Sequence, residues 1–194
     1  MQIKDIAIIV LAVLLIISVL TIIYIGKTKE IKIEDSKEIE KKWLINEKDI
    51  PYDLSKADKF EVEQTYICFE PEIRIRKLND GEFYTLTIKA NMSVDGLVRD
   101  EVEYYISEDE YEEILKKKEG NTIHKTRYQL YDGDFLREID IFKGDLAGLA
   151  YMETEFDTED IAKGEAEPSW VIKNVTSDKR YKNGSLARYG IPKD

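Results

Sequence analysis

Charged side chains occupy alternate positions in several short segments of this 194-residue chain, and these segments carry both signs of charge. One of them places Glu72, Arg74 and Arg76 on a single face of an extended backbone, whose other face is apolar. Arginine and lysine bind phosphate oxygens, whereas carboxylates bind hard divalent cations such as Mg²⁺. A simple basic pocket would not need the glutamates, and a simple calcium site would not need the arginines. The mixture therefore points to a triphosphate that carries divalent cations.

Any one of these segments, taken alone, could be a strand whose charged face is exposed to solvent. The charged faces would instead line an interior if the strands close into a barrel. Eight strands that close into a barrel leave an interior that admits only side chains or a small ligand. The apolar faces could then pack against outer helices, and the charged faces would line the interior. Buried charges cost free energy unless they are paired or meet a ligand. The alternating positions that this interpretation turns inward are Glu38, Glu40, Lys42, Glu72, Arg74, Arg76, Thr85, Thr87, Lys89, Arg99, Glu101, Glu103, Lys125, Arg127, Glu138, Asp140, Glu153 and Glu155.

The composition excludes several other kinds of site. Cys68 is the single cysteine, so no intramolecular disulfide can form, and His124 is the single histidine. Histidine-based zinc sites and histidine-centred triads are therefore nearly ruled out, and a metal must be held mainly by oxygen, which selects Mg²⁺, Mn²⁺ or Ca²⁺. The net charge of -11 argues against nucleic-acid binding by the outer surface, although it does not exclude a buried basic pocket.

Period-two patterning predicts a mainly β (α+β) fold. Turn signals such as Asn79-Asp80-Gly81 and Asp132-Gly133 separate several of the strands. Ser107 with Glu110 predicts a capping box at the start of a helix. We expect a closed, up-and-down, eight-stranded antiparallel barrel with short outer helices. The predicted strands are 36–46, 60–69, 71–78, 82–90, 97–107, 122–131, 134–143 and 149–157, and the predicted helices are 53–57, 107–118 and 158–162.

Residues 6–25 form a run of twenty residues without a charge, long enough to span a bilayer as a helix. The alternative, a cleaved signal peptide, would have a shorter apolar region followed by small residues at a cleavage site. Lysines are more frequent after the run than before it, which predicts that the following domain lies in the cytoplasm. We therefore expect an anchor with its flanks at 1–28, a linker at 29–35 and one domain at 36–194.

Several motifs in sequence order resemble the CYTH family, the triphosphate tunnel metalloenzymes. EIEKKWLI, which contains Glu38, Glu40 and Lys42, resembles the ExExK signature that opens CYTH domains. The segment 60–77 (FEVEQTYICFEPEIRIRK) is similar to the second and third strands of the family. Further resemblances are RDEVEYYI (99–106), HKTRY (124–128), EIDIF (138–142), METEF (152–156) and VTSDKRYKNGSLA (175–187).

The resemblance implies an eight-stranded tunnel that binds triphosphate end-on with two divalent ions, Mg²⁺ or Mn²⁺. It also assigns roles to residues at matching positions. Lys125 corresponds to the lysine proposed as general base for the attacking water, with a plain phosphate-binding cation as the alternative. Glu38, Glu40 and Glu155 would hold the metals, while Glu101, Glu103 and Glu153 would complete or orient the metal shell. Phosphate oxygens would be bound by Lys42, Arg74, Arg76, Lys89, Arg127 and Arg180.

The resemblance implies hydrolysis of inorganic triphosphate, with release of phosphate. Two alternatives stay open: a nucleotide-directed enzyme (nucleoside or thiamine triphosphatase, or adenylate cyclase) and a non-catalytic, membrane-tethered polyphosphate-binding module. The absence of an obvious base-recognition element favours inorganic triphosphate, and retention of Lys125 argues against pure binding. The expected partners are the triphosphate and, through the anchor, a membrane, with no nucleic acid; whether the chain forms a homodimer is left open.

Overall fold

The computed structural model describes residues 34–92 and 98–193, with side chains described for 39–89 and 101–193. The chain divides into compact units at Met1–Lys32 and Ile33–Asp194, and all described residues belong to the second. The expected anchor at residues 6–25 lies outside the described residues. Within 34–92 and 98–193, no helix is long and apolar enough to span a membrane.

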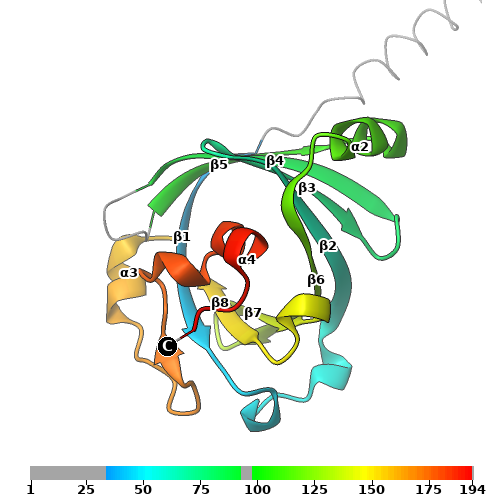
Figure 1. The fold of residues 1–194 in the computed structure, drawn as a ribbon. Helices are drawn as coiled ribbons and strands as arrows, with labels where there is room; N and C mark the ends of the chain where they lie inside the picture. The colour runs from blue at the N-terminus through cyan, green and yellow to red at the C-terminus, as the bar shows by residue number, and fades with distance from the viewer. Residues whose placement is uncertain (1–33, 93–97, 194) are drawn as a thin grey trace, which may run out of the picture. The chain divides into compact units, whose positions relative to one another are not determined.

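The strands form one antiparallel sheet that closes on itself (Figure 1). The sheet order is β5-β4-β3-β2-β6-β7-β8-β1-β9, and an additional pairing of β5 with β1 joins the ends of the eight-stranded part. β1 contributes to this closure with both halves, because its first half pairs with β5 and its second half with β8. The strands are β1 (Glu34–Leu44), β2 (Asp58–Phe69), β3 (Glu72–Leu78), β4 (Phe83–Met92), β5 (Val98–Tyr105), β6 (Glu119–Asp132), β7 (Phe135–Phe142), β8 (Ala150–Glu155) and the short β9 (Lys173–Asn174).

All eight predicted strands are present, but the predicted up-and-down order is wrong. β2 pairs with β3 and β6 instead of β1, and β5 pairs with β4 and β1 instead of β6. Consecutive strands from β2 to β5, and from β6 to β8, do lie next to each other in the sheet. The two exceptions follow the longest connections between consecutive barrel strands, which contain helical turns, so consecutive strands there need not be neighbours.

Helices are short and lie at the connections and the C-terminus. α2 (Glu108–Leu115) begins at the predicted capping box, in which Ser107 and Glu110 hydrogen-bond reciprocally. α3 (Glu159–Gly164) confirms the predicted helix near 158–162, whereas the predicted helix at 53–57 is only the 3₁₀ turn η2 (Leu54–Lys56). α4 (Asn183–Tyr189) was not predicted. The remaining 3₁₀ turns are η1 (Glu47–Asp49), η3 (Gly144–Leu146) and η4 (Lys179–Tyr181).

Two apolar clusters hold the barrel, one on its outer face and one in its interior. The outer cluster contains Trp43, Ile139 and Met152, and the segments around Tyr52 and Trp170 pack against it. The inner cluster joins Tyr66, Phe142 and Tyr151 of the inward strand faces to Leu186 and Ala187 of α4. In Figure 1, α4 is seen within the ring of strands. The C-terminal helix therefore fills one end of the barrel, and side chains of the strands line the rest.

Gly120, at the start of β6, allows α4 to pack closely on the barrel. A Cβ at this position would lie 2.9 Å from the backbone oxygen of Ala187 and 3.1 Å from the Phe69 ring. Gly133, in the β6–β7 turn, has a similar positive φ of 64° compared with 70° at Gly120, but a Cβ there would meet nothing within 4 Å. The two glycines therefore differ in packing and share the same backbone requirement.

We predict that Gly120→Ala destabilises the protein more than Gly133→Ala. Both substitutions carry a left-handed backbone penalty of about 1–2 kcal/mol, and Gly120→Ala adds an overpacking cost of about 1–3 kcal/mol. Denaturant unfolding of both variants gives the free energies to compare. Equal losses would show that α4 is not packed against β6 as described.

Candidate active site

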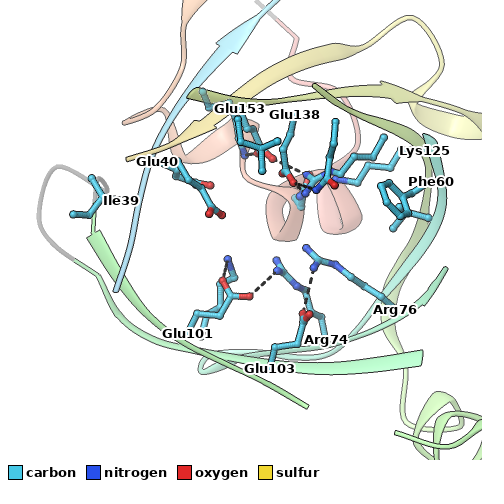
Figure 2. A pocket seen from close by; sticks show the side chains of 18 of the residues that line it. Ile39, Glu40, Phe60, Arg74, Arg76, Glu101, Glu103, Lys125, Glu138 and Glu153 are labelled. Carbon is cyan, nitrogen blue, oxygen red and sulfur yellow. Dashed lines mark hydrogen bonds and ion pairs between the residues drawn. The ribbon is translucent and has the colours of Figure 1, made fainter. Parts of the chain in front are cut away.

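A cavity of about 870 Å³ occupies the barrel interior (Figure 2). Its solvent-exposed lining includes Tyr131, Asp134 and Glu155, which lie at the end of the barrel opposite α4. Lys182 and Asn183, at the start of α4, line its inner end. Most of the charged residues predicted to point inward line this cavity, and Asp140 is buried. The side chains of Glu38 and Arg99 lie outside the described residues. The charged lining residues are Glu40, Lys42, Glu72, Arg74, Arg76, Lys89, Glu101, Glu103, Lys125, Arg127, Asp134, Glu138, Glu153, Glu155, Asp157 and Lys182.

One group of charges comes from β1, β6, β7 and β8. The Lys42 ammonium lies 2.6 Å from the Glu153 carboxylate. Arg127 donates to Asp140 and to Glu153 at 2.7 Å each. Lys125 also contacts Asp140, and both side chains are almost completely buried. These five residues form the first charged cluster, in which every described cation has a carboxylate partner.

A second charged cluster faces the first across the cavity and comes from β3, β4 and β5 (Figure 2). Arg74 lies 3.4 Å from Glu101, and Lys89 contacts the same carboxylate at 2.5 Å. Arg76 lies 3.3 Å from Glu103. Arg74 is also bonded to Glu72 at 3.0 Å. Both walls of the cavity therefore present cations held in place by carboxylates.

Strand register produces three of these ion pairs directly. Lys42 is opposite Glu153 in the β1–β8 ladder, Arg127 is opposite Asp140 in β6–β7, and Lys89 is opposite Glu101 in β4–β5. Side chains directly opposite each other on one sheet face lie about 4.5–5.5 Å apart at Cβ, within reach of an ion pair. A shift of one residue would turn a charged row outward, so the register and the site are specified together.

The buried pairs shift the pKa values of their members. Burial, reinforced by the neighbouring charge of Arg127, lowers the pKa of Lys125 to about 8, and Asp140 and Glu153 oppose the shift. Burial alone would raise the pKa of Asp140, but Arg127 and Lys125 hold it below its ordinary value. Glu153 behaves in the same way, since Lys42 and Arg127 outweigh its burial. At neutral pH Asp140 and Glu153 are therefore charged, and Lys125 is closer to losing its proton than an ordinary lysine.

Carboxylates are the available metal ligands in the described part of the cavity. Glu40 and Glu155 are direct partners in the β1–β8 register and both line the cavity, whereas the side chain of Glu38 lies outside the described residues. Within residues 39–89 and 101–193, no three acidic, histidine or cysteine side chains form a group that could hold a metal ion. This arrangement fits Mg²⁺, which is usually bound by one or two carboxylates together with substrate phosphates.

The structure brings most of the predicted residues together, with one exception. Arg180 does not line the cavity: its side chain is about half exposed and bonds Asp178 at 2.8 Å. Asp178 caps the 3₁₀ turn η4, and this local pairing directs Arg180 away from the barrel. His124 lies on the face of β6 opposite Lys125 and is exposed.

Sequence reasoning missed several residues of the site. Lys182 and Asn183 reach the cavity from the start of α4. The periodicity of the strands gives no indication that this helix lies inside the barrel. The sequence predicted that Asp140 points inward, on the same face as Glu138. It did not predict that Asp140 would be the partner of Lys125. Gln64 is fully buried on β2 and bonds two residues of the cavity wall.

The family model described as CYTH domain matches residues 27–189. The chain belongs to the CYTH family. An inorganic triphosphatase of Acetivibrio thermocellus is 35% identical over 155 residues, which cover 78% of this chain and 94% of that protein. An inorganic triphosphatase of Nitrosomonas europaea is 42% identical over 118 residues, covering 60% of this chain and 74% of that protein.

Solved structures of CYTH-like proteins agree with this assignment. The crystal structure of an inorganic triphosphatase matches with a TM-score of 0.56 and 33% identity, covering 77% of this chain and 93% of that one. A putative adenylyl cyclase from Hippeastrum, described as having a dominant triphosphatase activity, matches with a TM-score of 0.52. The match covers 66% of this chain and 83% of the Hippeastrum chain, and at 15% identity it shows only a shared fold.

Proposed function

We propose that this CYTH-family protein is a metal-dependent inorganic triphosphatase, a hydrolase that acts inside its barrel. The observation that carries the proposal is the pair of charged clusters facing each other across one cavity. A linear polyanion lying between them can accept hydrogen bonds from both walls at once. Two relatives with at least 35% identity are named inorganic triphosphatases, which supports the same substrate for this chain.

The charge balance of the cavity supports a requirement for divalent cations. Among the described residues, seven cationic and nine acidic side chains line it, so the lining is not net positive. A bare polyphosphate would be repelled by the acidic side chains of the lining, because a phosphate and a carboxylate both carry negative charge. A polyphosphate that carries Mg²⁺ or Mn²⁺ satisfies both the cationic and the acidic side chains.

Glu40 and Glu155 are the carboxylates that we assign to the metals, together with Glu38. Bound ions would neutralise charge on the transferring phosphoryl group and orient its oxygens. Glu101 and Glu153 instead bind the cations of the cavity walls. We therefore assign Glu101, Glu103 and Glu153 to holding the phosphate-binding side chains in place, and only indirectly to the metal shell.

The phosphate chain would be bound from two sides. Arg74 and Arg76 extend from β3 and offer planar guanidinium groups suited to bidentate contacts with phosphate. Lys42 and Arg127 approach from the opposite wall. Their carboxylate partners fix their positions before substrate arrives, which reduces the entropy lost on binding. Lys89 and Lys182 complete the set of cavity cations that we assign to phosphate binding.

Lys125 is the residue we assign as general base. It takes a proton from a water molecule whose oxygen attacks the terminal phosphorus. The bond from that phosphorus to its bridging oxygen breaks, and phosphate and pyrophosphate leave. Asp140 contacts the Lys125 ammonium and stabilises the charge that it acquires. A pKa of about 8 keeps a useful fraction of Lys125 neutral near physiological pH.

Metal dependence tests the proposed activity. We predict that phosphate release from inorganic triphosphate requires added Mg²⁺ or Mn²⁺. Glu40→Gln should raise the metal concentration needed for half-maximal rate by about 10–100-fold, because a ligand charge is lost without adding charge to the interior. Glu167→Gln, at an exposed position, is the matched control and should behave as wild type. Full activity of a metal-stripped preparation in EDTA would contradict the metal requirement, and a preference for ATP or thiamine triphosphate would correct the substrate.

Lys125 is tested by its pH dependence. Because a base must be deprotonated and its pKa is about 8, kcat/KM should rise with pH below that value and level off above it. Lys125→Ala should lower kcat by about 10²–10⁴-fold and remove this limb of the profile. Arg76→Ala should mainly raise KM, since it removes a phosphate contact. If Lys125→Ala raises KM and leaves kcat near wild type, Lys125 only binds phosphate.

We also propose that residues 6–25 anchor the protein in a membrane with the barrel in the cytoplasm, from the length of the uncharged run and the lysines that follow it. The full chain should remain with membranes after a high-salt wash and be released by detergent. Release by salt alone, or a mature N-terminus beyond residue 25, would contradict the anchor.

A further inference from the structure

Gln64 is a fully buried polar residue of β2, on the same strand face as the cavity-lining residues Val62 and Tyr66. Its side chain bonds two cavity-lining residues from opposite ends of the amide. The amide oxygen accepts from Nε of Arg76 at 3.0 Å, and the amide nitrogen donates to the Tyr66 hydroxyl at 2.8 Å. Gln64 is directly opposite Arg76 in the β2–β3 register, so the strand pairing holds this contact in place.

The direction of these hydrogen bonds is fixed by chemistry. The Nε–H of an arginine can only donate, so the group that Gln64 turns toward Arg76 must be its carbonyl oxygen. The NH₂ group must then face Tyr66, where the phenolic oxygen accepts. Among the described residues none accepts the Tyr66 proton, so the proton is left to point elsewhere.

The Tyr66 ring cannot turn away from the cavity. It stacks on Phe69 with ring centroids 5.0 Å apart, and α4 packs against it so closely that a Cβ at Gly184 would lie 3.6 Å from the ring. The side chain is fully buried and lines the cavity. Burial raises the pKa of Tyr66 above its ordinary value, so the hydroxyl keeps its proton at neutral pH.

We propose that Gln64 is a positioning residue that sets the hydrogen-bond direction of the cavity wall, turning the Tyr66 proton and the Arg76 guanidinium toward the substrate. The inference rests on the proposed function, because the acceptor it requires is a phosphate oxygen, which offers lone pairs and no proton. Figure 2 shows Arg76 extending into the cavity from β3, toward the space that a phosphate would occupy. Gln64 would act through its two neighbours without touching the substrate.

Gln64→Glu keeps the size and shape of the side chain but changes only one of its two hydrogen bonds. The new carboxylate still accepts from Arg76, which keeps it ionised, but it cannot donate to Tyr66. It accepts the hydroxyl proton instead, so Tyr66 turns its donor away from the substrate. We expect kcat/KM for triphosphate hydrolysis by the full chain to fall roughly 10–100-fold, the effect of losing one hydrogen bond to a charged group.

A double-mutant cycle distinguishes redirection of the Tyr66 proton from simple repulsion of the substrate by the new negative charge. In the Tyr66→Phe background no proton is left to redirect, so adding Gln64→Glu should lower kcat/KM by less than about twofold. Loss of the same factor in both backgrounds would overturn the proposal. Gln64→Met, which removes both contacts, should lower kcat and also raise KM, because Arg76 loses its partner; an unchanged KM would show that Gln64 does not position Arg76.

Thr65→Val is the matched structural control. Thr65 lies on the opposite face of the same strand and bonds Thr122 at 3.0 Å, so the substitution removes a buried hydrogen bond away from the cavity. It should lower the melting temperature and leave kcat and KM unchanged. If Gln64→Glu behaves like Thr65→Val, Gln64 is only structural. A wild-type chain that fails to hydrolyse triphosphate in the same assay would contradict the proposed function instead of the role of Gln64.

Discussion

The interior of this barrel is built on charges that water no longer solvates. Removing an ion from water costs several kcal/mol unless opposite charges and hydrogen bonds replace the solvent. The described cations of the two clusters meet this requirement through carboxylates of the same sheet, which lie on the neighbouring strand for Lys42 with Glu153 and for Lys89 with Glu101. The pairs therefore hold the phosphate-binding groups in place before any substrate enters. A metal-bound triphosphate can join this network because it also carries both signs.

Closure of the sheet and the position of α4 turn these pairs into a site. β1 pairs with both β5 and β8, which brings the two charged clusters to opposite walls of one cavity. The inner apolar cluster and α4 fill one end, so Lys182 and Asn183 reach the cavity from the C-terminus. The same packing immobilises the ring of Tyr66. Fold and site thus depend on one set of contacts, and a change in strand register would disrupt both.

The sequence could predict which charges point inward because the residues of a strand alternate between two faces. In these strands one face was charged and the other was apolar. It could not predict which strands pair after a long connection, so the strand order was wrong at β1 and β5. Arg180 was expected in the cavity but does not line it, and a local bond to Asp178 at the turn η4 holds its side chain instead. Gln64 reads as an ordinary polar residue in a strand until its partners Arg76 and Tyr66 are seen across the fold.

The central claim is that triphosphate lies between the two charged clusters with its metals at the carboxylate pair of β1 and β8. A crystal structure of the protein with triphosphate and Mn²⁺, with the metal located by its anomalous scattering, tests this directly. We predict phosphate oxygens in contact with Arg76 on one wall and Arg127 on the other, and Mn²⁺ beside Glu40 and Glu155. Triphosphate bound outside the barrel, or Mn²⁺ held only by carboxylates away from Glu40 and Glu155, would contradict the account.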